Sequence, residues 1–239
     1  MTAPAFYALR PGGWRDYVTL LHLPYTAWHL SYVVVGGCLA ATVDWGVLGL
    51  TVVAFALAMG VGAHALDELN GRPLGTHIPA KVLVGLAAGS VGVACAVGIA
   101  VAVERTLWIV PLVALGAALV PVYNLELLGG RAHTDLGFAL SWGAFPAITA
   151  FVAQAGSLRA EGLLAAGWAT VLSLAQRRLS TPVRRLRREV TSVEGGLVRS
   201  DGARKPLDRE ALTAPAEAAL RLLAAASALL AATLVTLRI

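Results

Sequence analysis

The sequence predicts an all-α protein that crosses a membrane several times, a polytopic bundle of about seven transmembrane helices. Of the 239 residues, 57% are hydrophobic and only 14% are charged. A soluble domain carries about 25% charged residues, so a chain this apolar places much of its surface against lipid. Gly and Ala are frequent in the apolar segments, where small residues let helix backbones approach closely in lipid. The alternating pattern of a transmembrane β-barrel does not occur.

Seven apolar segments have the length of a membrane helix. The hydrocarbon core of a bilayer is about 30 Å thick and takes about 20 helical residues to cross. We expect the helices to form a single domain over residues 1–239, with a basic cytoplasmic loop at about 181–213. The segments lie at residues 18–43, 46–67, 80–103, 106–128, 135–154, 161–180 and 214–237.

The distribution of basic residues predicts the orientation of the bundle. Most of the 19 Lys and Arg residues lie on the same side of the predicted membrane as the N-terminus. Because cytoplasmic loops carry an excess of Lys and Arg, we expect a multi-pass protein of the cell membrane with a cytoplasmic N-terminus. The same rule accounts for the net charge of +5, so we expect contact with membrane lipids and no nucleic-acid partner.

The first polar cluster closes the second predicted helix and contains His64, Asp67 and Glu68. Charged groups inside membrane helices are costly and persist mainly where they serve a function. Carboxylate oxygens suit Mg²⁺, which commonly bridges to phosphate, so we take Asp67 and Glu68 as candidate metal ligands. The alternative is a hydrated helix end at the interface, although acids at a helix C-terminus oppose the macrodipole.

The second cluster closes the fourth predicted helix and opens the fifth. Tyr123 and Asn124 are expected at bundle depth, whereas Glu126 and His133 flank a Gly-Gly turn. We take Asn124 and Glu126 as candidate functional residues. The alternatives are that Tyr123 belongs to an interfacial aromatic belt and that Asp135 only caps the fifth helix.

The third cluster begins inside the sixth apolar segment and runs from Gln176 through Arg177 and Arg178 to Arg184. Arginine makes bidentate contacts to phosphate and stays charged. The alternative is a topology signal or an anionic-lipid patch. That alternative explains the arginines at the far end of the run better than those that begin within the apolar segment.

Pro182 predicts that the sixth helix unwinds near Ser180, because the residue before a proline is pushed out of the helical region. Arg177 would then turn toward the acidic cluster or a bound phosphate, while Arg187 and Arg188 would face lipid headgroups. By the parity of the helix count, all three clusters lie on one side of the membrane. Acids for Mg²⁺ and arginines for phosphate are what the head of a lipid diphosphate requires, with its tail between the helices.

Three stretches of the chain resemble the UbiA-type intramembrane prenyltransferase family and together cover about residues 1–160. The resemblance implies a UbiA-like fold and Mg²⁺-dependent transfer of an isoprenoid from its diphosphate to an acceptor. Asp67 and Glu68 match the first of the family's two Asp-rich motifs; the second motif is missing, which indicates a divergent member. The stretches are Leu21 to Gly37, Ala63 to Pro79 and Tyr123 to Gly156.

The preferred hypothesis is a divergent UbiA-like membrane transferase that acts on a polyprenyl diphosphate or related lipid phosphate at the cytoplasmic face. Mg²⁺ near Asp67 and Glu68 would stabilise the leaving diphosphate. His64, Asn124 and Glu126 would position the acceptor or a metal-bound water. The alternative, which the missing motif favours, is a non-catalytic membrane protein that binds a lipid or partner enzymes. The candidate substrate-binding residues are Arg72, Tyr123, Gln176, Arg177, Arg178 and Arg184.

The predicted orientation is testable by cysteine labelling. With Ser200→Cys, an impermeant thiol reagent should label the protein only after cell lysis, because the 181–213 loop is expected in the cytoplasm. With Ile239→Cys, it should label intact cells, because an odd number of helices places the C-terminus outside. Labelling of Ser200→Cys in intact cells would contradict the orientation, and labelling of both sites only after lysis would contradict the helix count.

Overall fold

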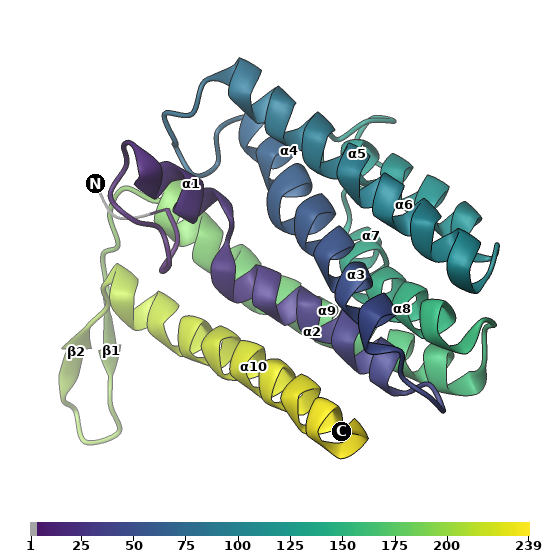
Figure 1. The fold of residues 1–239 in the computed structure, drawn as a ribbon. Coiled ribbons are helices and arrows are strands. Elements are labelled where there is room, and N and C mark those ends of the chain that lie inside the picture. The colour runs from purple at the N-terminus through teal and green to yellow at the C-terminus, as the bar shows by residue number, and fades with distance from the viewer. Residues whose placement is uncertain (1–3) are drawn as a thin grey trace.

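The apolar segments fold into long helices that run along a common axis (Figure 1). The computed structural model describes residues 4–239. Two rods are continuous across short π-helical turns: α3, η1 and α4 form Trp45–Leu69, and α7, η2 and α8 form Asp135–Ala155. In chain order the elements are α1 (Trp14–Leu20), α2 (Leu23–Cys38), α3 (Trp45–Phe55), η1 (Ala56–Ala63), α4 (His64–Leu69), α5 (Ala80–Arg105), α6 (Ile109–Asn124), α7 (Asp135–Ala139), η2 (Leu140–Ala144), α8 (Phe145–Ala155), α9 (Ala160–Arg188), β1 (Gly196–Val198), β2 (Arg204–Pro206) and α10 (Arg209–Arg238).

Four helices of the described chain are long and apolar enough to cross a membrane. They are the rods Trp45–Leu69 and Asp135–Ala155 together with α5 and α10. The fold is therefore an all-α bundle suited to a membrane, but length and composition identify fewer spans than the seven expected. Helices α2 and α6 have only 16 residues each, short of the roughly 20 that a bilayer requires. The last turns of α9 are dominated by arginine.

The first predicted helix, residues 18–43, is interrupted and shorter than expected. His22 adopts a left-handed conformation with φ 47°, and α2 starts directly after it. Pro24 lies in the first turn of α2, where its missing N–H removes no helical hydrogen bond. The proline therefore starts a new helix instead of letting α1 continue.

The expected unwinding near Ser180 does not occur, because α9 continues through Pro182 to Arg188. Proline removes the hydrogen bond to the carbonyl of Arg178, four residues earlier. Arg178 and Pro182 are both exposed, so the missing hydrogen bond lies on an exposed face of α9, where water can replace the donor. The predicted 181–213 loop therefore starts as helix, and further along it forms the antiparallel β1–β2 hairpin.

Helix α2 and the rod Asp135–Ala155 occupy the centre of the bundle. In the most apolar window of that rod 67% of the residues are buried, against 22% in α5 and 17% in α10, which lie at the periphery. The side chains of Trp28 and Tyr32 on α2 are fully buried. A Cβ atom at Gly36 would lie 2.1 Å from the carbonyl oxygen of Ala147, so the α2 and α8 backbones are in direct contact.

The polar ends of the helices gather at one end of the bundle. The N-terminal segment, α1, the hairpin and the start of α10 lie there, and the C-terminus lies at the opposite end (Figure 1). Helix α10 packs against α2 and α9, whereas α5 packs against the rod Trp45–Leu69 and α6. This arrangement brings the ends of α4, α6 and α9 to the same end of the molecule.

The contact at Gly36 leads to a stability prediction. Gly36→Ala should lower the free energy of unfolding by about 1–3 kcal/mol, because the new methyl group forces α2 away from the Ala147 carbonyl. Gly89→Ala on α5 is the matched control, since its Cβ meets nothing within 4 Å and alanine favours helix. Thermal unfolding in detergent, followed by circular dichroism, measures both. Equal effects of the two substitutions would contradict the close α2–α8 contact.

Candidate functional site

A polar cavity of about 140 Å³ opens at the polar end of the bundle. Its wall combines the N-terminal segment with α2, the rod Trp45–Leu69, the end of α6, α7 and α9. Seven of the candidate residues, from three helix ends far apart in sequence, line this cavity. They are His64, Asp67, Tyr123, Asn124, Gln176, Arg177 and Arg184.

Glu68 faces away from the polar cavity. Its side chain is fully buried, and its carboxylate accepts hydrogen bonds from Leu74 N at 2.9 Å, Thr76 N at 2.8 Å and Thr76 Oγ1 at 2.9 Å. These bonds fold the loop after α4 around the carboxylate. Glu68 is therefore not positioned to bind a metal ion in the cavity. Its neighbour in sequence, Asp67, lines the cavity.

The other three candidates outside the polar cavity have local or exposed positions. Arg72 adopts φ 53° and donates through Nη1 to the carbonyl oxygens of Thr76 and Ile78, so it braces the same loop as Glu68. The Glu126 side chain is 54% exposed, and its Oε1 lies 3.8 Å from His133 Nδ1. Arg178 points outward, as its neighbour Arg177 points inward.

The continuous α9 helix carries the arginines of the cavity. Arg184 and Arg188 follow Arg177 by seven and eleven residues, close to whole numbers of helical turns, so the three share one stripe. Arg177 Nε donates to Asp135 Oδ1 at 3.1 Å, and its guanidinium lies over the Phe138 ring at 5.3 Å. Arg177 therefore pairs with Asp135 on α7, whereas we expected it to face Asp67 or a bound phosphate.

Arg187 is bound to α10 instead of facing lipid headgroups. It donates through Nε and Nη2 to the two carboxylate oxygens of Glu217 at 2.6 and 2.9 Å. In contrast, neither Arg184 nor Arg188 has a carboxylate within 4 Å among residues 4–239. Burial lowers the pKa of Arg184, and an anionic ligand would offset that desolvation.

The polar cavity is also lined by Tyr7, His22 and His29, which were not among the candidates. Tyr7 Oη lies 2.9 Å from His22 Nδ1, and the His22 ring stacks on His64 with centroids 4.0 Å apart. Burial raises the pKa of Tyr7, so its hydroxyl stays protonated beside His22. His29 follows His22 by seven residues, about two helical turns along α2. The sequence did contain a signal for the two histidines, since titratable residues in an apolar segment often serve a function.

Two polar atoms in the wall of the cavity lack a hydrogen-bond partner within the described chain. They are Tyr123 Oη and Gln176 Oε1, and both side chains are buried. Buried polar groups are normally satisfied by protein, water or a ligand. These two atoms therefore mark a place where a ligand can form hydrogen bonds.

The acidic groups fit a metal ion only in part. Asp67 and Glu217 line the polar cavity, and Glu217 is paired with Arg187. Nowhere in residues 4–239 do three or more His, Cys, Asp or Glu side chains gather in an arrangement that could hold a metal ion. The residues present fit Mg²⁺ only with Asp67 as the protein carboxylate and phosphate oxygens as most of the other ligands.

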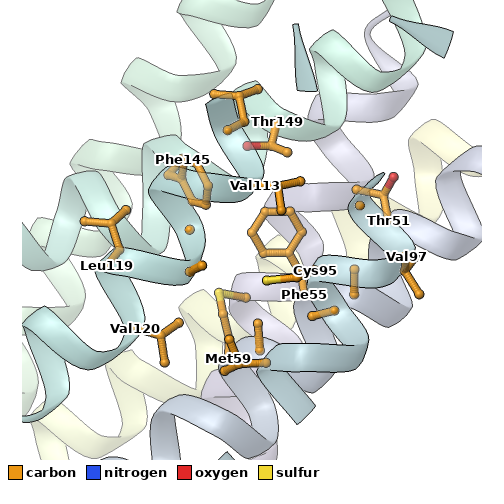
Figure 2. Close-up of a pocket in the computed structure, with 18 of the residues that line it drawn as sticks. Thr51, Phe55, Met59, Cys95, Val97, Val113, Leu119, Val120, Phe145 and Thr149 are labelled. Atoms are coloured by element: carbon orange, nitrogen blue, oxygen red, sulfur yellow. The ribbon is translucent and has the colours of Figure 1, made fainter. Parts of the chain in front are cut away.

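An apolar cavity of about 90 Å³ lies beside the polar one, between the rod Trp45–Leu69, α5, α6 and the rod Asp135–Ala155. Figure 2 shows its wall, in which Phe55, Cys95, Val113 and Phe145 converge from these helices. Met59 lines both cavities, as does Trp142. The two cavities therefore adjoin, with a charged mouth on one side and an apolar space on the other.

The position of Glu68 predicts a structural role. Glu68→Ala should lower the free energy of unfolding by about 2 kcal/mol or more, since it leaves the buried N–H groups of Leu74 and Thr76 without an acceptor. The same substitution at exposed Glu126 should change it by less than about 0.5 kcal/mol. Thermal unfolding of both variants tests this, and a stable Glu68→Ala protein would show that the loop does not depend on the carboxylate.

Comparison of the chain with protein-family models, with curated proteins and with solved structures finds no match. The resemblance to the UbiA-type family therefore remains an expectation from the sequence. The candidate site rests on the geometry and chemistry of this chain.

Proposed function

We propose that the polar cavity binds the head of a polyprenyl diphosphate or related lipid phosphate at the cytoplasmic face, and that the protein is a divergent UbiA-like membrane transferase. One observation carries the proposal: Arg184 and Arg188 line the polar cavity, neither has a carboxylate within 4 Å among residues 4–239, and an apolar cavity lies directly beside them. Positive charge that adjoins an apolar space matches a ligand with an anionic head and an apolar tail.

The head of the ligand would bind to the arginine stripe. Guanidinium groups form paired hydrogen bonds with phosphate oxygens, and these are stronger than bonds between neutral groups. Arg184 and Arg188 are available for such bonds, whereas Asp135 already holds Arg177 in place. Mg²⁺ enters the proposal as an ion that accompanies the diphosphate beside Asp67, where it would neutralise charge on the leaving group.

The tail of the ligand would extend into the apolar cavity past Met59 and Trp142, which line both spaces. The wall on the apolar side consists almost entirely of aliphatic and aromatic side chains, as Figure 2 illustrates. Burial of each methylene group of a lipid chain stabilises binding by about 0.8 kcal/mol. His64 and Asn124 are the remaining candidates for positioning an acceptor, since Glu126 lies outside the cavity.

The proposal includes a seven-span arrangement with the N-terminus in the cytoplasm. The shorter helices α2 and α6 would cross with help from their neighbours, because α2 is enclosed by α8, α10 and α3. The arginine-rich end of α9 would then lie at the cytoplasmic interface, as the positive-inside rule requires.

A second candidate function is non-catalytic binding of the same lipid. The Glu68 carboxylate already accepts hydrogen bonds from the loop after α4. Asp67 is then the one carboxylate of the pair left for a metal ion, which favours non-catalytic binding. Incubation of the full chain with geranylgeranyl diphosphate, Mg²⁺ and a membrane extract as the source of acceptor separates the two. Release of diphosphate together with a geranylgeranylated acceptor supports the transferase, and stable binding without either product supports the lipid-binding protein.

The proposal predicts a specific effect at Arg184. In the full chain in nanodiscs, Arg184→Lys should weaken binding of geranylgeranyl diphosphate by about tenfold or more, because lysine keeps the charge but loses the paired hydrogen bonds. Arg178→Lys is the matched control and should change the affinity less than about twofold, since Arg178 points outward. Equal effects would mean that the arginines act only as a topology signal.

The metal arm of the same experiment uses Asp67→Asn. This substitution should weaken diphosphate binding when Mg²⁺ is present and change it little when Mg²⁺ is absent. An equal loss in both conditions would assign Asp67 a structural role and would remove Mg²⁺ from the proposal.

A further inference from the structure

We propose that the β1–β2 hairpin docks onto the surface of an anionic lipid bilayer through one of its two faces, the face that carries Leu197, Arg199 and Lys205. Every residue from 194 to 206 is exposed. Figure 1 shows the hairpin standing apart from the bundle, beside the start of α10. An isolated two-stranded hairpin is only marginally stable in water, so a surface that it rests on would stabilise it. The inference concerns neither cavity and does not depend on the proposed function.

The attachment of the hairpin to α10 places it at the membrane surface. Helix α10 is long and apolar enough to cross a bilayer, and only two residues lie between the end of β2 at Pro206 and its start at Arg209. A backbone hydrogen bond from Leu207 N to Gly195 O, at 3.1 Å, closes the base of the hairpin beside the head of that helix. In Figure 1 the hairpin projects sideways from the head of α10, away from the other helices. It therefore lies within reach of the lipid headgroups.

The strand register assigns each side chain of the hairpin to one of two faces. Leu197 lies opposite Lys205, and Val198 lies opposite Arg204. Directly opposed residues of an antiparallel pair share a face, and successive residues of a strand alternate between the faces. One face therefore carries Leu197, Arg199 and Lys205, and we call it the lipid face. The opposite face carries Val198 and Arg204.

The acid of the hairpin, Asp201, belongs to the turn. Its Oδ1 accepts a hydrogen bond from Ala203 N at 2.9 Å, and Gly202 adopts φ 83°, which suits glycine in a short hairpin turn. Asp201 Oδ2 lies 3.9 Å from Arg199 Nε, and both side chains are mostly exposed. An exposed ion pair of this length contributes little, because solvent screens it. Arg199 thus keeps its charge available for a phosphate group.

The lipid face matches the chemistry of an anionic membrane surface. Basic side chains next to a membrane helix are attracted by the negative surface potential of anionic lipids, and this face carries two of them, Arg199 and Lys205. Leu197 on the same face is 54% exposed and can enter the apolar boundary below the headgroups. A soluble polyanion would pair with the two charges but leave Leu197 in water. A lipid surface accommodates all three side chains.

The test measures the depth of two adjacent positions by electron paramagnetic resonance. Nitroxide labels are attached to Leu197→Cys or to Val198→Cys in the full chain, with Cys38→Ala and Cys95→Ala, in phosphatidylglycerol nanodiscs that each hold one copy. Val198 is the matched control, because it is adjacent and exposed but lies on the opposite face. Oxygen, which concentrates in lipid, should reach the label at 197 better than a water-soluble nickel complex does. The order should be reversed at 198, and equal depth at both positions would overturn the inference.

The second arm tests the role of charge. In phosphatidylcholine nanodiscs, which have no net charge, the docked population should fall by about tenfold or more, because both basic side chains lose their attraction to the surface. The pair Arg199→Gln and Lys205→Gln should cause the same loss in phosphatidylglycerol without a change in melting temperature. The same depth at 197 in both lipids would overturn the inference. A label at 197 that stays in water in phosphatidylglycerol would also overturn it and would leave this face to a protein partner.

Discussion

The charge balance of the arginines near the end of α9 governs the polar end of the molecule. Guanidinium groups that leave bulk water need anionic partners, since a buried unpaired charge is strongly destabilising. Asp135 on α7 neutralises Arg177, and Glu217 on α10 neutralises Arg187. These two ion pairs connect α9 to helices on both sides. Arg184 and Arg188, which line the polar cavity and have no carboxylate within 4 Å in residues 4–239, provide the positive charge on which the proposed function is based.

The two π-helical turns lie where the cavities meet. Met59 belongs to η1 and Trp142 to η2, and both residues line the polar and the apolar cavity. A π-helical turn rotates the side chains after it relative to a regular helix and occurs frequently at functional sites. In η2 the cause is local, because Pro146 removes a helical donor. The carbonyl that this leaves free is the one that orients His29.

Not all of the polar residues near the cavity serve a ligand. Glu68, Arg72 and Asp16 together hold the loop between α4 and α5, with Asp16 accepting hydrogen bonds from the backbone of Gly12 and His77. A buried loop must satisfy its own backbone N–H and carbonyl groups, and these side chains do so. Acidic residues beside a membrane helix thus have two different roles within one short segment.

The sequence alone determined that the chain is all-α, that several of its helices are apolar enough for a membrane, and that three polar helix ends lie at one end of the bundle. These follow from composition, segment length and parity, which do not depend on packing. Only the tertiary structure decided that Asp67 and not its neighbour Glu68 faces the cavity. Neighbours on a helix differ by about 100° in direction, so their roles depend on how the helix is rotated against its partners. His29 could not be predicted from the sequence either. The carbonyl oxygen that orients its ring belongs to Trp142, 113 residues away on a different helix.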